Sequence, residues 1–399
     1  MKQRLEDNSL ILEEYHKYLI RELNASKDYI TNTFKLLKRI DLANASNQTI
    51  TTFLDTLRKP ESIDPLHKWI GTYNLYLDGI KRFFKWYGKP EVMDGVKRYK
   101  RKEKSIYKPS DLWTTEDDLL FYKYCPSKKY CCYHAVSRDS SCRPSELLRV
   151  KVKDVMFKMA GNKQYAEILV SGKTGSRHIP LINSIPYLKD WLEDHPEKNN
   201  PNAYVFGRKG NKITSEGIRN NYKYRLKPYF ESLKNIDSTD KERIKELLKK
   251  PWSPYIRRHS ALTDKSKILK EHVLRQHAGW SISSRMPEKY LHYFGNESNE
   301  AILEAYGLKP KDQEINKLQP VQCPNCGEGN RVDSKFCAKC RMVLSYDAYS
   351  ETVEEKNQVN DKIDLLQSQM QVLLSGLSNT DQPTKNKMAK SLVESGLFK

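Results

Sequence analysis

The sequence predicts an α+β fold that is mainly helical and carries one small antiparallel β-sheet. Apolar side chains recur at helical spacing through most of the first 95 residues. Three short runs of strand-like composition follow between residues 150 and 182, and glycines separate the last two runs. Four clustered cysteines after residue 320 indicate a further small module, and a heptad-like pattern follows them.

The length and charge of the chain restrict its partners and its compartment. Its 399 residues suffice for two or three domains, and 70 Lys plus Arg against 50 Asp plus Glu give a net charge of +20. Such an excess favours a polyanionic partner, with DNA or RNA first, although a basic soluble protein would also show it. The N-terminus lacks a signal-peptide core, and no apolar run approaches the ~18 residues of a membrane span. We therefore expect a cytoplasmic protein with no membrane partner and few disulfides.

Residues 1–100 are expected to form a small helical domain with a packed core. Ser26 is a candidate N-cap for the second of four helices. Aromatic side chains at helical spacing are more often core than base-stacking groups. Basic residues such as Lys81, Arg82 and Lys85 would lie on the outer face. The four apolar stripes are Leu12, Tyr15, Leu19 and Leu23; Ile30, Phe34 and Leu37; Ile50, Phe53, Leu54 and Leu57; and Trp69, Tyr73, Tyr76, Ile80 and Phe83.

A basic linker, residues 101–110, is expected to join this domain to a second one. The linker and the residues just before it are crowded with Lys and Arg, from Lys97 to Lys104, and the run ends near Pro109. Such a run is usually a solvated connection. Because it lies between two basic halves, it would also suit tracking a phosphate backbone, and the two interpretations stay open.

Residues 111–309 are expected to form the second domain, helical around the small sheet. Its first helix has an N-cap signal at Thr114 or Thr115, with acidic residues in the first turn. A turn containing Gly172 and Gly175 would connect the second and third strands. The three expected strands are Val150–Met156, Tyr165–Val170 and Arg177–Ile182.

Five residues suited to phosphodiester chemistry occur in one order along the chain: Arg143, Lys173, Arg258, Trp280 and Tyr290. Two arginines can grip two phosphate oxygens, a hairpin lysine can donate a proton, and a tyrosine can be the nucleophile. Each residue type is common on protein surfaces, so one alone would indicate little. Their order suggests DNA strand exchange through a covalent intermediate, with no cofactor for catalysis, neither a metal nor a nucleotide.

The local contexts of the two arginines suit an anion site. Arg143 precedes Pro144, which favours the first turn of a helix, where unpaired backbone N–H groups also attract anions. Glu146 lies three residues further on and can orient the Arg143 guanidinium. Arg258 falls one turn into another predicted helix, which Ser253 can cap. Both arginines are therefore expected near helix starts.

The lysine and the tryptophan have weaker local signals. Lys173 lies in a turn between two glycines, which permit a sharp bend and close approach to a ligand. The Walker pattern G-x-x-x-x-G-K-[ST] is absent, and a lysine in a turn is most often solvated. Trp280 offers one indole N–H donor and a large packing surface. Lys173 and Trp280 are candidates mainly because of their positions in the series of five residues.

These segments resemble those of tyrosine recombinases, the phage-type integrase family, and look closest to its archaeal integrases. Arg143 resembles the first arginine of the family, Lys173 its hairpin lysine, and Arg258 the arginine of its H-x-x-R motif. Trp280 matches the position that holds His or Trp, and Tyr290 matches the nucleophile. The resemblance spans about residues 8 to 308 and is stronger in the C-terminal part.

The resemblance implies an activity, a set of partners and an architecture. It implies a site-specific recombinase that cuts double-stranded DNA through a 3′-phosphotyrosyl link and acts as a homo-tetramer on two DNA sites. Residues 1–100 would be the core-binding domain and residues 111–309 the catalytic domain. Two alternatives stay open: a catalytically inactive DNA-binding protein of the same fold, and a type IB topoisomerase-like enzyme.

One position departs from the family pattern. Tyr255 stands where the H-x-x-R motif usually has histidine. A phenol, with an ordinary pKa near 10, is a weaker base at neutral pH than imidazole, near 6.5. His259 is a candidate substitute, although a structural hydrogen bond within its helix is the commoner role for such a residue.

Four cysteines predict a structural zinc site in a short ribbon, residues 319–345. Their spacing is C-x2-C, ten residues and C-x2-C, and four thiolates satisfy tetrahedral Zn²⁺. A redox dithiol is the alternative, and four protein ligands argue against a catalytic zinc. The ligands would be Cys323, Cys326, Cys337 and Cys340. The other cysteines, Cys125, Cys131, Cys132 and Cys142, are expected to be buried thiols.

Residues 346–399 are expected to form a helical tail. Apolar residues alternate four and three apart in its first half, which fits a short coiled-coil seam. An amphipathic helix that packs on its own protein would show the same pattern. The seam residues are Val359, Ile363, Leu366, Met370, Leu373 and Leu377.

Overall fold

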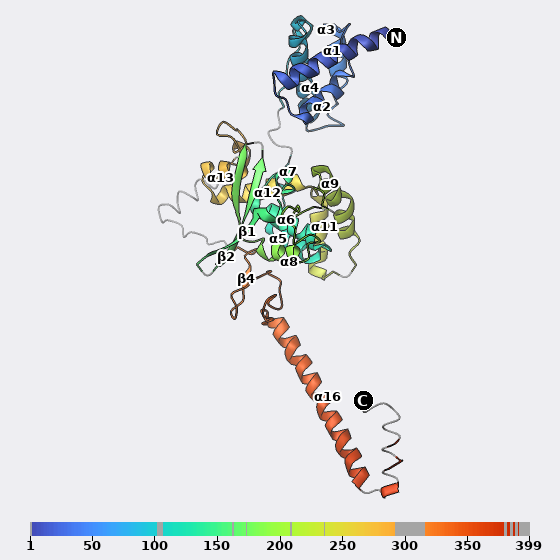
Figure 1. The fold of residues 1–399 in the computed structure, drawn as a ribbon, viewed down its shortest axis with the longest axis vertical. Coiled ribbons are helices and arrows are strands. Elements are labelled where there is room, and N and C mark those ends of the chain that lie inside the picture. Colours follow the sequence, from blue (N-terminus) through green and yellow to red (C-terminus); the bar gives the residue numbers. More distant parts are fainter. Residues whose placement is uncertain are drawn as a thin grey trace. The chain divides into compact units, whose positions relative to one another are not determined.

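The chain divides into two compact units, Met1–Lys108 and Pro109–Lys399, in a computed structural model (Figure 1). The structure describes residues 2–101, 107–161, 163–172, 174–207, 210–234, 236–291 and 316–378, with scattered residues between 381 and 390. Both units are dominated by helices, and the second adds a small antiparallel sheet, so the predicted fold class is confirmed.

The first unit consists of four helices around one apolar core. Ser26 caps the second helix, as predicted, since its hydroxyl accepts a hydrogen bond from the Tyr29 N–H at 3.3 Å. A capping box at Ser46 starts the third helix. The elements are α1 (Lys2–Arg21), α2 (Lys27–Leu37), α3 (Asn47–Asp55) and α4 (Trp69–Trp86), followed by a 3₁₀ turn at Pro90–Met93.

Aromatic side chains fill the core of this unit, as their spacing predicted. The Tyr15 ring lies edge-on to Phe83 at 5.1 Å and packs against Trp86 at 4.9 Å. Tyr15 and Phe83 are fully buried, so they serve the core and not a base-stacking surface. The expectation for Leu23 was wrong. It lies beyond the end of α1, which stops at Arg21, and is 43% exposed.

The second unit contains most of the helices. Thr114 caps its first helix in a capping box with Asp117, which settles the choice between Thr114 and Thr115. A π-helical turn at Tyr222–Leu226 joins α9 to α10. The helices are α5 (Thr115–Tyr124), α6 (Lys128–Ser140), α7 (Pro144–Leu147), α8 (Ile185–Glu193), α9 (Ser215–Asn221), α10 (Lys227–Glu231), α11 (Ser238–Lys249), α12 (Pro254–Ile268), α13 (Glu271–Ala278), α14 (Glu288–Leu291) and α16 (Tyr346–Ser378).

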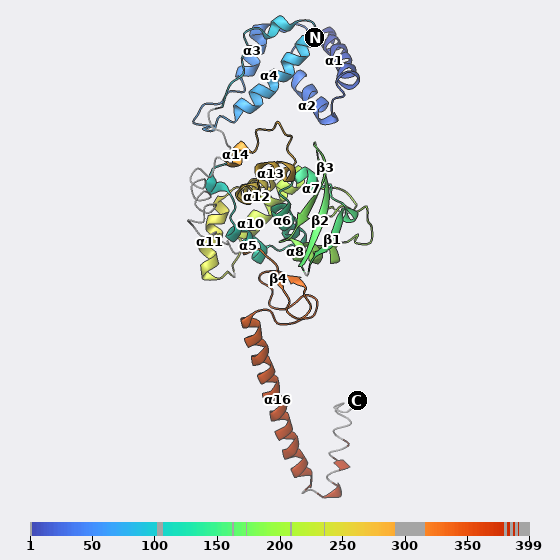
Figure 2. The ribbon, with the colours of Figure 1, turned by 90° about the vertical axis from the view of Figure 1, so that its left-hand side faces the viewer.

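The main sheet has three antiparallel strands in the order β1-β2-β3 (Figure 2). They are β1 (Val155–Ala160), β2 (Lys163–Gly172) and β3 (Gly175–Leu181). The second and third strands lie where predicted, but the first begins at Val155 and not at Val150. Residues Val152–Asp154 form a 3₁₀ turn instead, because the Asp154 carboxylate accepts the Lys151 N–H at 2.9 Å. Two short strands, β4 (Val321–Gln322) and β5 (Gly329–Asn330), pair separately.

A buried ionic cluster joins α5, α6 and α12 in the centre of the second unit. Asp118 is fully buried, and its Oδ1 lies 2.8 Å from His134 Nε2. Its Oδ2 accepts a hydrogen bond from Arg257 at 3.0 Å and forms an ion pair with Arg138 Nε at 3.1 Å. Burial alone would raise the pKa of Asp118, but the Arg257 charge and the His134 hydrogen bond lower it, so the carboxylate is ionised. The cluster fixes α12 relative to α6.

Within the described part of the chain, no helix combines the length and the apolar composition required to cross a membrane.

Candidate functional site

Arg143 and Glu146 form a reciprocal pair at the start of α7. Arg143 takes the N-cap position in extended conformation (φ −64°, ψ 143°), and Pro144 follows as the first helical residue. The Arg143 backbone N–H donates to Glu146 Oε2 at 3.1 Å, and its Nη1 donates to Oε1 at 2.7 Å. Glu146 therefore orients the guanidinium, as the sequence suggested.

Glu146 is a charged group in a buried position. Its side chain is 2% exposed, and burial by itself would raise its pKa. Hydrogen bonds from Arg177 and Arg143 outweigh burial and lower the pKa of Glu146. The carboxylate thus stays ionised at neutral pH and balances part of the positive charge around it.

Arg258 is held by backbone carbonyls near the start of α12. Ser253 caps this helix with a hydrogen bond from the Ile256 N–H at 3.4 Å, and Pro254 is its first residue. Arg258 Nη1 donates to the Ser141 carbonyl at 2.6 Å, and Nη2 donates to the Ala278 carbonyl at 2.8 Å. Burial, followed by the nearby Arg143 charge, lowers the pKa of Arg258 to about 10, so it stays protonated at neutral pH.

The two guanidinium groups meet at the end of α13. Both Nη1 and Nη2 of Arg143 donate to the Gly279 carbonyl at 3.2 Å, and Arg258 binds the preceding carbonyl, that of Ala278. A guanidinium has five N–H donors. Among the described residues, Arg143 uses three of its donors and Arg258 two, so each retains N–H groups for another acceptor. A ligand with two anionic oxygens suits this pair.

The hairpin that carries Lys173 ends beside these arginines. Gly172 of β2 pairs with Gly175 of β3, which leaves a two-residue loop, and Gly175 has a φ of +105°. Lys173 itself lies outside the described residues. Its neighbour Thr174 donates from Oγ1 to the Gly279 carbonyl at 3.1 Å. The loop is thus anchored to the backbone oxygen that also receives Arg143.

Tyr290 lies in a small apolar cluster with Trp280, next to the arginines. The two rings stack at 5.4 Å, and the side chains of Leu262, Leu274 and Ala278 complete the cluster. The Tyr290 hydroxyl lies 2.9 Å from His259 Nδ1. Tyr290 is 2% exposed and Trp280 is 8% exposed. The phenol therefore faces the protein interior.

The structure separates Tyr255 from His259. Tyr255 lies in the first turn of α12 and is 47% exposed. His259 lies one turn further along, and its ring stacks near Tyr290 at 5.6 Å with a hydrogen bond to the phenol. His259 therefore contacts Tyr290, the candidate nucleophile. The hydrogen bond is between two side chains, not within the helix.

Arg177 is a member of the site that the sequence did not single out. Its Nε donates to the His277 carbonyl at 3.1 Å, and its Nη2 donates to Glu146 Oε2 at 3.0 Å. Its side chain is 12% exposed. The only signal in the sequence was its position four residues after Lys173, at the start of a predicted strand. The contact to α13 is set by tertiary structure alone.

The four predicted zinc ligands converge in a separate small module. Their Sγ atoms all lie within 4.8 Å of one another, with Cys323–Cys340 at 3.5 Å and Cys326–Cys337 at 3.6 Å. Tetrahedral Zn–S bonds of about 2.3 Å require S···S separations near 3.8 Å, so the cluster fits zinc. The four cysteines are therefore able to hold a structural Zn²⁺.

Two similar turns prepare these thiols. The Gly327 N–H donates to the Cys323 carbonyl at 2.9 Å, and the Arg341 N–H donates to the Cys337 carbonyl at 3.0 Å. Both donors have positive φ, +69° at Gly327 and +62° at Arg341. The same turn in both C-x-x-C segments therefore holds each pair of cysteines close together.

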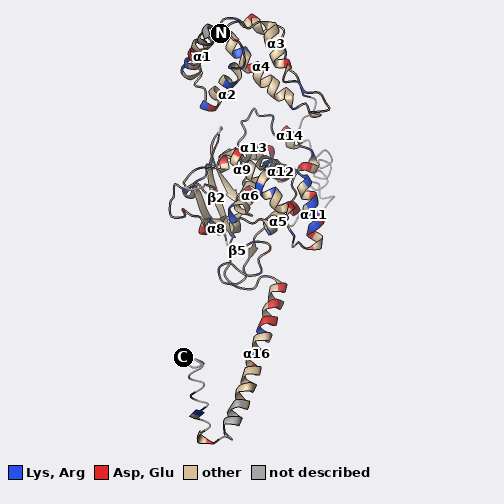
Figure 3. Ribbon diagram, turned by 90° about the vertical axis from the view of Figure 1, so that its right-hand side faces the viewer, with Lys and Arg blue, Asp and Glu red and all other residues tan. Residues whose placement is uncertain are grey.

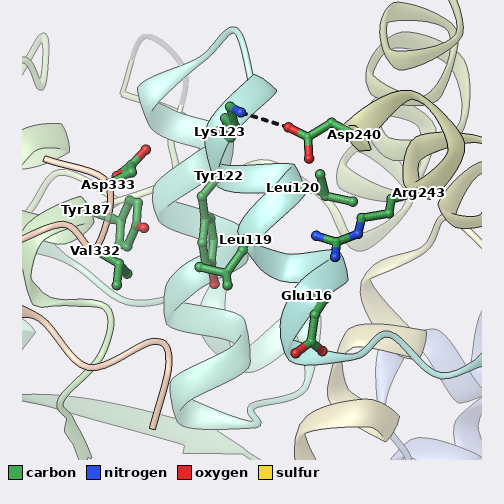
Figure 4. A pocket seen from close by; sticks show the side chains of 10 residues that line it. All are labelled: Glu116, Leu119, Leu120, Tyr122, Lys123, Tyr187, Asp240, Arg243, Val332 and Asp333. Carbon is green, nitrogen blue, oxygen red and sulfur yellow. Dashed lines mark hydrogen bonds and ion pairs between the residues drawn. The ribbon is translucent and has the colours of Figure 1, made fainter. Parts of the chain in front are cut away.

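A small pocket lies elsewhere in the second unit, between α5 and α11 (Figure 4). Its cavity volume is about 180 Å³. Tyr187, Val332 and Asp333 line one side, and Lys123 pairs with Asp240 at 2.7 Å on the other. None of the four candidate catalytic residues that the structure describes, Arg143, Arg258, Trp280 and Tyr290, lines this pocket.

Comparisons with known proteins give similarity only to solved structures. No protein-family model and no curated protein matches the chain. A lambda integrase dimer bound to a COC′ core site covers 72% of this chain and 79% of its own, at 14% identity and a TM-score of 0.49. The Tn1549 transposon integrase in complex with a circular intermediate DNA covers 74% and 99%, at 14% identity and 0.48. XerH recombinase bound to difH substrate covers 74% and 84%, at 19% identity and 0.45.

Proposed function

We propose that this protein is a site-specific DNA recombinase that cuts and rejoins strands through a 3′-phosphotyrosyl intermediate on Tyr290. The observation that carries the proposal is the meeting of Arg143 and Arg258 on two consecutive carbonyls, next to the Trp280–Tyr290 cluster. Forked, charged donors with remaining N–H groups are suited to a phosphodiester. The net charge of +20 supports a nucleic-acid partner.

In the proposed reaction, the Tyr290 oxygen attacks phosphorus and the bond to the 5′ oxygen breaks. A 3′-phosphotyrosyl bond forms, and Lys173 supplies the proton that leaves with the 5′-hydroxyl. Arg143 and Arg258 stabilise the negative charge on the non-bridging oxygens. Attack by the 5′-hydroxyl of a partner strand reverses these steps and releases Tyr290. The phosphodiester bond energy is retained throughout.

The surroundings of Tyr290 suggest how its proton leaves. His259 Nδ1 lies 2.9 Å from the phenol oxygen and accepts this proton when the imidazole is neutral. Since Tyr290 is 2% exposed, DNA binding has to expose the phenol before it reaches a phosphate. The burial of the phenol is also the observation that favours the inactive DNA-binding alternative.

Replacing Tyr290 by Phe tests the proposal directly. The full-length protein would be incubated with fragmented genomic DNA, denatured, and assayed for DNA that stays covalently bound. We expect adducts with the natural sequence and none with Tyr290→Phe, while DNA affinity stays within about threefold, because only the nucleophilic oxygen is removed. Tyr224→Phe, which changes a tyrosine that is 63% exposed, is the matched control and should retain adducts.

The outcomes separate the alternatives. DNA binding without any adduct from the natural sequence would establish the inactive binding protein. Adducts that persist in Tyr290→Phe would show another nucleophile. Sequencing the attached DNA gives the preferred site, and relaxation of a supercoiled plasmid that lacks this site would favour the topoisomerase-like enzyme.

The other parts of the chain have proposed roles in the same reaction. Residues 1–100 would hold the DNA beside the catalytic unit, residues 111–309. The four-cysteine module would be a zinc ribbon, and its metal would stabilise the fold without taking part in the reaction. Four copies of the chain would assemble on two DNA sites, since strand exchange requires two duplexes and two cleavages on each.

A further inference from the structure

Three arginines bind three consecutive carbonyls at the end of α13. Arg177 Nε donates to His277, Arg258 Nη2 to Ala278, and Arg143 Nη1 and Nη2 to Gly279. The arginines come from β3, α12 and the start of α7, and lie far apart in the sequence. One turn of backbone therefore sets the spacing between three cations.

The end of a helix is a favourable place for these cations. The last carbonyls of an α-helix have no partner within the helix and carry the negative end of its dipole. Gly279 ends α13 in left-handed conformation (φ +63°), and its N–H and that of Trp280 turn back onto Gln276 and Arg275. The carbonyls of His277, Ala278 and Gly279 are thereby left to accept hydrogen bonds from the arginines.

Gly279 is needed because the Arg177 guanidinium occupies the space where a Cβ would lie. A Cβ added at Gly279 would lie 2.6 Å from Arg177 Nη1 and 2.7 Å from Cζ. Real Cβ atoms do not approach other atoms so closely. Any side chain at this position would displace the Arg177 guanidinium.

Arg177 is linked to Arg143 through Glu146. Glu146 Oε2 accepts from Arg177 Nη2 at 3.0 Å, and Oε1 accepts from Arg143 Nη1 at 2.7 Å. Gly172 allows this arrangement, since a Cβ there would collide with Glu146 Oε1. A shift of Arg177 would move the carboxylate that orients Arg143.

The charges of this group do not balance. Three guanidinium groups surround one carboxylate, which leaves a net charge of +2 in a largely buried place. Arg177 Nη1 has no hydrogen-bond partner within the described part of the chain. A group selected for stability alone would be expected to pair its charges. A doubly positive cluster suits a site prepared for an anion.

We infer that Arg177 is a positioning residue for the cleavage reaction, and that the end of α13 together with Gly279 is the template for the three arginines. The inference deepens the proposed function and depends on it. Arg177 holds Glu146 and through it Arg143, while its own Nη1 lies next to Gly279. It does not contact the reacting atoms.

The first experiment replaces Arg177 and measures cleavage and binding separately. The substrate is a nicked duplex that contains a site recovered by adduct sequencing, so that each molecule is cut once. We expect Arg177→Ala to slow adduct formation by about 10- to 100-fold, as for small misplacements of catalytic groups, with DNA affinity within about threefold. Free guanidinium should restore part of the rate in Arg177→Ala, which a purely structural defect would not allow. Arg219→Ala, at an arginine whose side chain is 58% exposed, is the surface control.

The second experiment uses two glycines with the same backbone conformation. Gly279 has a φ of +63° and Gly161 a φ of +61°, but a Cβ at Gly161 would meet nothing within 4 Å. Ala at either position brings a similar backbone strain. Only Gly279→Ala should lower the cleavage rate by about tenfold or more, whereas Gly161→Ala should cleave like the natural sequence.

These outcomes distinguish the inference from the proposed function. If the natural sequence forms no adduct, the proposed function is wrong. If it does, and Arg177→Ala cleaves at the natural rate, or Gly279→Ala and Gly161→Ala behave alike, the positioning role is wrong while the function stands. A loss of rate that guanidinium does not restore, together with a matching loss of DNA affinity, would also contradict it. Arg177→Lys covers the case in which Arg177→Ala does not fold; it keeps the charge without the forked plane and should also cleave slowly.

Discussion

Adjacent arginines on α12 serve different purposes. Arg257 is fully buried and binds Asp118 at 3.0 Å, so it holds α12 to α5. Arg258, the next residue, turns toward the carbonyls of Ser141 and Ala278. Because successive helical residues point about 100° apart, one arginine anchors the helix while the other is presented to the site. The position of the Arg258 guanidinium therefore depends on the buried cluster around Asp118.

That cluster predicts a loss of stability in mild acid. Burial, together with the Arg257 charge, lowers the pKa of His134 to about 4 from an ordinary value of 6.5. Between these values the unfolded chain binds a proton at this residue and the folded chain does not, so the free energy of unfolding falls as pH drops from about 6.5 to 4. The melting temperature, measured from pH 7.5 to 4.5, should fall over this window.

A glutamine at position 134 is the control for this pH effect. Its amide can still donate to Asp118 but does not titrate, so the decline in melting temperature below pH 6.5 should be smaller in His134→Gln. An unchanged pH profile would show that other groups cause the decline. His277, whose pKa burial lowers to about 3, contributes to the same window in both proteins.

At the scale of elements, the cysteine ribbon is fastened to α8. Arg331 of the ribbon lies over the Tyr187 ring at 4.9 Å and pairs with Asp190, and Glu328 pairs with Lys189. Each of these contacts involves a charged side chain. The ribbon has few apolar side chains of its own, so the four thiolates and their metal are expected to supply most of its stability.

Metal content tests this expectation. The purified protein should contain about one zinc per chain by elemental analysis, and Cys337→Ser should lose most of it, because three thiolates bind the ion more weakly. Cys125→Ser changes a cysteine outside the cluster and should keep the metal. A natural protein without zinc, or Cys337→Ser with a full complement, would contradict the assignment.

At the scale of the whole molecule, α16 presents an apolar seam to solvent. Val359, Ile363, Leu366 and Met370 are 45–63% exposed, so this part of the seam does not pack against the described part of its own chain. The side chains of Leu373 and Leu377 lie outside the described residues. The charged residues of α16 lie in its N-terminal part, and none occurs from residue 365 to residue 378 (Figure 3). Apolar seam positions with four-three spacing are self-complementary and favour a second copy of the chain as the partner.

Self-association should therefore depend on the seam of α16. Leu366→Glu places a charge in the seam and should lower the molar mass of the free protein in light scattering from an oligomer toward a monomer. Ser368→Glu adds the same charge two residues away, outside the seam, and should leave the mass unchanged. A full-length protein that is monomeric at tens of micromolar, or equal effects of both changes, would contradict this role.

Local sequence predicted where several helices start, but not where the first strand begins. Ser26, Thr114 and Pro144 mark helix starts through local hydrogen bonds and fixed dihedral angles, and such signals do not depend on distant contacts. The first strand was placed too early because Asp154 binds the backbone of Lys151 and turns the chain there. Local apolar pattern alone does not reveal that competition.

The sequence by itself determined the fold class, the four-cysteine cluster and the residue types of the site, because periodicity, capping and ligand spacing are properties of neighbouring residues. Only the tertiary structure brought Arg143, Arg177 and Arg258 to consecutive carbonyls of α13 and set His259, not Tyr255, against Tyr290. These contacts join residues that lie from 20 to 136 positions apart in the sequence. Their geometry follows from how helices pack, which no local pattern encodes.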